Sequence, residues 1–177
     1  MCDVIFNIKI IDQIYKVMDY DLKKTNSLQV RVRVCGLHLT EEGILLLRHE
    51  GIGANGFLWS PPGGGIESNE NARSALIREF KEETHLDIVV EDFCFTNEYR
   101  DEQVHAIELF FSVRVIGGHL KLGRDPELKN QILTQANYLS YEQVNQLNKL
   151  NKHNAFQFCS DAAHINKLRG YYFFQNI

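Results

Sequence analysis

Three glutamates lie close together in residues 64–86, the stretch GGIESNENARSALIREFKEETHL. On a helix that turns about 100° per residue, Glu79, Glu82 and Glu83 share one face within a single turn. Like charges at this spacing repel each other. Carboxylate oxygens gathered on one face are ligands that suit Mg²⁺, which usually shares them with substrate phosphates. The pattern therefore indicates a metal site, and a solvated acidic helix face is the alternative that it leaves open.

The segment before these glutamates, SPPGGG at 60–65, is rich in proline and glycine. The two prolines stiffen the chain, and the three glycines allow its backbone to come close to a ligand. A glycine-rich turn that leads into a helix N-terminus suits anions such as phosphate. No Gly-Lys-Ser/Thr follows, so the segment is not a P-loop.

A helix over about residues 69–84 must carry the glutamates, with Ser68 or Asn69 as its N-cap. An apolar face adjoins the acidic one on this helix, and small alanines precede the glutamates on the acidic face, which leaves room above them. Arg78 lies four residues before Glu82 and is expected to pair with it. One arginine cannot neutralise three carboxylates, which again favours a bound cation.

Alternating apolar and polar residues predict the strands that surround this helix. The predicted strands are 30–39, 44–48, 86–95, 103–116 and 137–139. The first two are expected to form a hairpin around the turn TEEG. SYEQ at 140–143 has capping-box spacing and opens a second helix. A short helix is expected near 159–168, before the aromatic tail GYYFF.

The composition is that of one globular α/β domain. The 177 residues are 44% hydrophobic and carry a net charge of −4, without a block of basic residues. We therefore expect no nucleic-acid polymer as partner, no membrane span and a cytoplasmic location with four reduced cysteines. The expected division is an N-terminal extension of uncertain structure at 1–28, a domain at 29–150, and a C-terminal helix and aromatic tail at 151–177, packed on that domain.

The order Gly64, five residues, Glu70, seven residues and then REFKEETHL resembles the Nudix box, Gly-x5-Glu-x7-Arg-Glu-U-x-Glu-Glu-x-Gly-U, in which U is apolar. Residues 30–86 also resemble the strands and loop that lead into the box in bacterial MutT-like members. One position departs from the signature, because His85 replaces the second glycine. That glycine ends the helix in the left-handed region, which histidine adopts more readily than most residues.

The resemblance implies a Nudix α/β/α sandwich with a mixed, mostly antiparallel sheet between helices. It also implies hydrolysis of a small-molecule nucleotide, a nucleoside diphosphate linked to another moiety, with Mg²⁺ or alternatively Mn²⁺. The metal ligands that it implies are Glu79, Glu82, Glu83 and the carbonyl oxygen of Gly64. Glu82 is either a third ligand or the general base. Arg78 holds a carboxylate in place, and Glu70 has a structural role.

Residues outside the box supply further candidates. Family members often place the general base on a distant loop; Glu127 in DPEL is the first choice here, followed by Glu98 and Glu102. Arg48, Trp59, Gly63 and Gly65 are candidates for substrate binding, with Arg31 and Arg33 as further arginines that could reach phosphate. Core packing is the competing interpretation for the tryptophan, and a solvated strand face for the arginines.

The substrate stays open at this point. We find neither the downstream proline of ADP-ribose hydrolases nor a tyrosine placed as in dinucleoside polyphosphate hydrolases. ADP-ribose-like nucleotides and nucleoside triphosphates, including oxidised ones, therefore both remain candidate substrates. A catalytically inactive Nudix-fold nucleotide-binding or regulatory module is the alternative of a different class. A homodimer with the aromatic tail as its interface is a further alternative.

Overall fold

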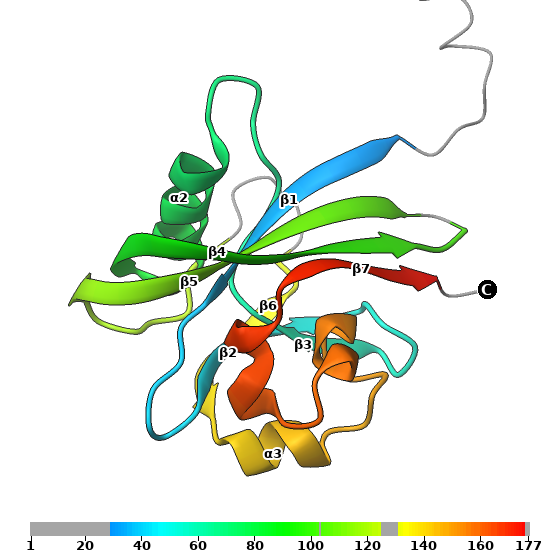
Figure 1. Ribbon diagram of the computed structural model, residues 1–177. Coiled ribbons are helices and arrows are strands. Elements are labelled where there is room, and N and C mark those ends of the chain that lie inside the picture. The colour runs from blue at the N-terminus through cyan, green and yellow to red at the C-terminus, as the bar shows by residue number, and fades with distance from the viewer. Residues whose placement is uncertain (1–28, 103, 125–130, 176–177) are drawn as a thin grey trace, which may run out of the picture.

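The computed structural model describes residues 29–102, 104–124 and 131–175 (Figure 1). Residues 1–28, expected to be an extension, and Glu127, expected to be a general base, lie outside the described residues. A four-stranded sheet has the order β1-β5-β4-β7. Its strands are β1 (Val30–Leu37), β4 (Leu86–Arg100), β5 (His105–Gly118) and β7 (Gly170–Gln175). β1 runs parallel to β5 and β7 parallel to β4, whereas β4 and β5 are antiparallel.

A second sheet of three antiparallel strands has the order β3-β2-β6. Its strands are β2 (Ile44–Glu50), β3 (Phe57–Ser60) and β6 (Leu133–Leu139). The helices are α2 (Ala72–Thr84), α3 (Tyr141–Gln146) and two 3₁₀ helices, η1 (Asn154–Phe158) and η2 (Ala162–Lys167). None of the described helices has the length and apolar character needed to cross a membrane.

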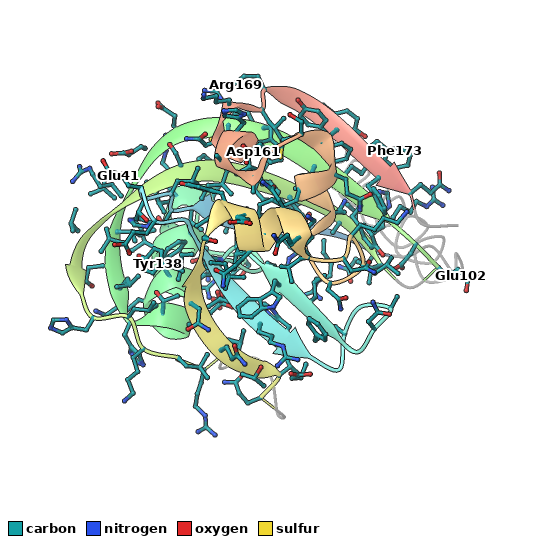
Figure 2. All side chains as sticks on the ribbon, turned by 90° about the horizontal axis from the view of Figure 1, so that it is seen from below. Glu41, Glu102, Tyr138, Asp161, Arg169 and Phe173 are labelled. Carbon is teal, nitrogen blue, oxygen red and sulfur yellow. The ribbon has the colours of Figure 1, made fainter. Side chains whose placement is uncertain are left out.

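Both faces of the four-stranded sheet are covered by apolar side chains. α2 packs Leu76 and Phe80 against Val34 and Phe111 on one face. On the other face, Phe95 and Phe110 stack in a core that includes residues of β2, α3, η1 and η2. Figure 2 looks onto this second side, where Asp161 marks the start of η2 and Tyr138 lies on β6. The α/β sandwich predicted from the sequence is therefore confirmed, with two sheets in place of one.

The predicted hairpin of the first two strands is wrong. β1 and β2 lie in different sheets, and the segments between them meet in a local bridge between Leu39 and Ile44, with a hydrogen bond from Leu45 N–H to the His38 carbonyl at 3.1 Å. Residues 44–47 are all buried, so both faces of β2 are covered, and its hydrogen-bonding edges are occupied by β3 and β6. β2 thus pairs with the strand that follows it, β3, and with the distant β6, and not with the strand before the turn TEEG.

Two helix boundaries also differ from the prediction. α2 begins at Ala72, because the side chain of Asn71 accepts hydrogen bonds from the N–H groups of Arg73 and Ser74, both at 3.0 Å. Ser68 and Asn69 precede this N-cap. Near the C-terminus, the short helix expected near 159–168 is present as the 3₁₀ helix η2, an unpredicted η1 precedes it, and the aromatic tail forms strand β7.

The glycine-rich segment extends the four-stranded sheet along the outer edge of β1. Val34 N–H donates to the Gly64 carbonyl at 2.9 Å, and Ile66 N–H donates to the Val32 carbonyl at 3.1 Å. Gly63 has a φ of +149°, and a Cβ there would lie 2.0 Å from the Val34 carbonyl oxygen. Only glycine allows the segment to approach β1 this closely.

The C-terminal end of α2 has the predicted left-handed residue. His85 has φ 59° and ψ 12°, and its N–H donates to the Lys81 carbonyl at 3.1 Å. It is the one non-glycine residue with positive φ among the described residues.

We expect His85→Gly to stabilise the protein. Removing Cβ relieves about 1 kcal/mol of strain in the left-handed region, less about 0.5 kcal/mol for the larger backbone entropy of glycine in the unfolded chain. Thermal unfolding should shift upward by about 1–2 °C. His85→Ala, which keeps Cβ, is the matched control and should give no gain; equal stabilisation by both variants would assign the effect to the imidazole instead.

Candidate active site

α2 buries two of its glutamates together with its apolar side chains. Glu79 and Glu83 are only 5% and 3% exposed, one turn apart, beside the buried Leu76 and Phe80. A carboxylate this deep is costly unless it is paired or hydrogen-bonded. The surroundings of these two groups therefore determine what the site can do.

Arg78 connects the carboxylates of the box to one another. Its guanidinium donates to Glu70 at 2.7 and 3.2 Å and to Glu79 at 3.0 Å. It also donates to Glu82 at 3.1 Å, which confirms the pair expected from their spacing, and to the Gly65 carbonyl at 3.1 Å. The hydrogen bond from Arg78 lowers the pKa of Glu70, and the same bond raises the pKa of Arg78. The pair thus stays ionised over a wide pH range.

The glycine segment touches both buried carboxylates. Gly63 N–H donates to Glu83 Oε2 at 2.9 Å. A Cβ on Gly64 would lie 2.2 Å from Glu79 Oε1, so a side chain here would occupy the position of that carboxylate. The glycine segment and the two buried carboxylates of the helix therefore lie against each other.

A cavity of about 520 Å³ opens beside these groups, and residues of both sheets line it. The predicted site residues that line it are Glu79, Glu83, Gly63, Gly64, Gly65, Arg31 and Arg33. A volume of this size is typical of sites for small organic ligands. The structure thus brings the two buried carboxylates, the glycines and two arginines to a common space.

Several predicted site residues lie elsewhere. Trp59 is buried in the apolar core, so the core interpretation and not base stacking holds for it. Arg48 pairs with Glu50 at 2.9 Å, lies over the Phe57 ring and is not among the residues that line the cavity.

The other carboxylate candidates are also outside the cavity lining. Glu82 is held by Arg78 and does not line the cavity. Glu98 accepts from Tyr171 and lies 2.7 Å from His105 Nε2, and Glu102 is exposed at the end of the β4–β5 connection. Figure 2 shows Glu102 at the margin of the molecule.

A buried polar network on the cavity wall was not predicted. Glu108 of β5 accepts from Asn97 Nδ2 at 2.7 Å and lies 3.1 Å from His153 Nε2. Arg33 is 3.9 Å from the same carboxylate and donates to the Gly63 carbonyl at 3.4 Å. The one sequence signal was a charged residue inside the apolar strand AIELFF; nothing local marked His153.

The network keeps Glu108 ionised. Burial alone raises the pKa of Glu108, but His153, Arg33 and Asn97 lower it by more, to about 2. His153 Nδ1 accepts from Ala155 N–H at 3.2 Å, which places the imidazole proton on Nε2, facing Glu108. Glu108 and His153 thus contact each other, and Arg33, whose contacts with Glu108 and Gly63 are longer, lines the cavity beside them.

The donor set suits a hard divalent cation with phosphate as co-ligand. No three His, Cys, Asp or Glu side chains gather into a complete metal site among the residues that the structure describes. Two carboxylates, Glu79 and Glu83, nevertheless face the cavity together. Mg²⁺ is typically held in this way, by one or two carboxylates, water and the phosphates of a substrate.

Solved structures of known proteins share this fold. A NUDIX hydrolase from Nitrosomonas europaea aligns with a TM-score of 0.63 at 19% identity, over 80% of this chain and 93% of that one. A MutT protein from Methanosarcina mazei aligns with a TM-score of 0.58 at 21% identity, over 71% and 88% of the two chains. At these identities the likeness concerns the fold alone.

Sequence comparison extends the likeness beyond the fold. The ADP-ribose pyrophosphatase of Methanocaldococcus jannaschii is 36% identical over 108 residues, which are 59% of this chain and 63% of that protein. The match therefore spans less than two thirds of that relative. The NUDIX domain family matches residues 28–158. With the box, the cavity and the fold in agreement, the chain belongs to the Nudix family.

Proposed function

We propose that the protein hydrolyses the diphosphate linkage of a nucleoside diphosphate joined to another group, with Mg²⁺ or Mn²⁺ as cofactor. The observation that carries this proposal is the pair of buried carboxylates, Glu79 and Glu83, beside the glycine segment in a cavity of about 520 Å³. A nucleotide-binding module without activity is disfavoured, because every charged residue of the box is present.

An ADP-ribose-like nucleotide is the favoured substrate, since the curated relative that shares 36% identity is an ADP-ribose pyrophosphatase. Nucleoside triphosphates are the second candidate. The cavity volume lies in the range typical of small-molecule sites and accommodates either class.

The proposed roles follow from the contacts. Glu79 and Glu83 would hold the metal, which when bound neutralises the diphosphate oxygens and lowers the pKa of the attacking water. Arg78 positions Glu79 through its hydrogen bond at 3.0 Å. Arg33 offers a positive charge to phosphate oxygens from the wall of the cavity. Glu127 remains the proposed proton acceptor, because Glu82 is engaged with Arg78.

The Gly64 carbonyl is a further proposed ligand of the metal. It already accepts from Val34 N–H at 2.9 Å. A carbonyl oxygen has two lone pairs, so this bond leaves one available. Glycine is needed at position 64 because a Cβ there would collide with the Glu79 carboxylate.

Glu83→Gln should abolish most of the activity and leave the fold intact. The amide keeps the shape of the side chain but not the charge that holds a divalent cation, so turnover of ADP-ribose should fall about a hundredfold or more. Metal-free stability should stay the same or rise slightly as repulsion with Glu79 is removed. Steady-state kinetics and thermal unfolding measure both; near wild-type turnover would refute the metal assignment.

Gly64→Ala should reduce turnover by displacing the Glu79 carboxylate, because the new methyl group would lie 2.2 Å from Oε1. Gly65→Ala is the matched comparison, since a Cβ there meets no atom within 4 Å. We expect the Gly64 variant to need a clearly higher Mg²⁺ concentration for half-maximal rate than the Gly65 variant. Equal metal requirements would show that the closeness of Gly64 to Glu79 has no bearing on the metal.

Hydrolysis in ¹⁸O-labelled water tests where the bond breaks. Attack at a bridging phosphorus converts ADP-ribose to AMP and ribose 5-phosphate, with one ¹⁸O in one of the two products. A triphosphate would give a monophosphate and pyrophosphate. Mass spectrometry of the products distinguishes these outcomes. Labelled orthophosphate released from a simple monophosphate would indicate a phosphatase, and tight nucleotide binding without turnover across a broad panel would indicate a binding module.

A further inference from the structure

The sheet wall of the cavity is built from rows of side chains that face each other across the strands. In the outer row, Arg31 of β1 is opposite Ala106 of β5, Ala106 is opposite Tyr99 of β4, and Tyr99 is opposite Phe174 of β7. All four residues line the cavity. The row therefore crosses the whole sheet, from an arginine at one edge to two aromatic rings at the other.

The two rings at the end of this row are stacked on each other, and their outer faces form an aromatic surface. The centroids of Tyr99 and Phe174 are 6.0 Å apart, and their planes differ by only 9°. Tyr99 Oη donates to Asp101 Oδ2 at 2.7 Å, which fixes the orientation of its ring. The neighbour in the row is alanine, so the rings have a recess beside them and not another bulky side chain.

The aromatic surface lies at the opposite end of the cavity wall from the glycine segment. Arg33 of β1 and Gly65 form an isolated β-bridge, so the glycine segment lies along the free edge of β1. From β1 the sheet continues with β5, β4 and β7 in that order. With strands about 4.8 Å apart, the segment and Tyr99 are separated by about 14 Å. A ligand whose phosphates lie at the glycines and Glu79 extends towards the rings with its remaining part.

β7 lies outside the residues that match the NUDIX domain family. The family matches residues 28–158, whereas β7 spans Gly170–Gln175 and is the edge strand of the sheet (Figure 1, red). Tyr171 and Phe173 of the same strand point to the other side of the sheet and are 60% and 47% exposed. Only alternate residues of the tail, such as Phe174, can therefore serve the cavity.

We propose that β7 completes a nucleobase site, in which the aromatic base of the substrate stacks on the surface formed by Phe174 and Tyr99. The assignment rests on the proposed function for the position of the phosphates. Aromatic side chains stack on any base, because every base has a π-face. The surface thus selects for a nucleotide over a diphosphate without a base, and Phe174 lies beyond the residues that match the family.

Phe174→Ala and Phe173→Ala form a matched pair for the test, because they remove the same side chain from neighbouring positions on opposite faces of β7. Binding of AMP and of ribose 5-phosphate, each with Mg²⁺, is measured by isothermal titration calorimetry. We expect Phe174→Ala to weaken AMP binding about tenfold and to leave ribose 5-phosphate binding unchanged. Phe173→Ala should change neither, and Phe174→Tyr should restore AMP binding.

Kinetics with ADP-ribose give a second readout. For Phe174→Ala, KM should rise about tenfold with kcat within about twofold of wild type. Should the alanine variant unfold, Phe174→Leu keeps an apolar side chain in the strand and removes only the ring, with the same expected loss of AMP binding. Equal effects of the Phe173 and Phe174 variants, equal loss of AMP and ribose 5-phosphate, or unchanged AMP binding would each overturn the assignment.

The two proposals fail in different ways. Loss of AMP binding in Phe174→Ala, in a protein that hydrolyses no member of the nucleotide panel, would support the base site and refute the proposed hydrolysis. Normal hydrolysis with AMP binding that is insensitive to Phe174 would support the hydrolysis and refute the base site.

Discussion

The hydrogen bonds of Arg78 are the interaction on which the site depends. One guanidinium reaches three glutamates of the box and the carbonyl of Gly65, and so ties the glycine segment to the helix that follows it. The planar group with five N–H donors can make these bonds at the same time, which a lysine ammonium cannot. Arg78 also offsets the charge of carboxylates that would otherwise repel one another within one turn.

The glycine segment is constrained from two sides. On one side it hydrogen-bonds to the edge of β1, where Gly63 comes within van der Waals contact of the Val34 backbone. On the other side it meets the carboxylates of Glu79 and Glu83. Because these contacts leave no space for Cβ at 63 or 64, the segment can connect the sheet to the carboxylates only as glycine. The distance between β1 and the acidic face of α2 is thereby fixed by backbone atoms.

Local features of this site could be predicted from the sequence, and non-local ones could not. The shared face of Glu79 and Glu83, the pairing of Arg78 with Glu82 and the left-handed His85 follow from helix periodicity and end geometry within a few residues. The pairing of β1 with β5, the Glu108–His153 contact and the place of Phe174 depend on segments far apart in the chain. Trp59 illustrates the same limit, since the core cluster that contains it includes residues of α3, η1 and η2, far along the chain.

The parallel pairing of β7 with β4 has a consequence for how the molecule is assembled. Parallel neighbours cannot be joined by a tight turn. Phe95 of β4 pairs with Gly170 of β7, so this pairing cannot form until Gly170 has been synthesised. Closing such a long loop costs entropy before any contact is gained. Because a chain leaves the ribosome with its N-terminus first, Glu79 and Glu83 are available for folding well before Phe174 emerges. The residues at the carboxylate end of the cavity thus leave the ribosome well before the strand that carries Phe174, which pairs with β4 only at the end of synthesis.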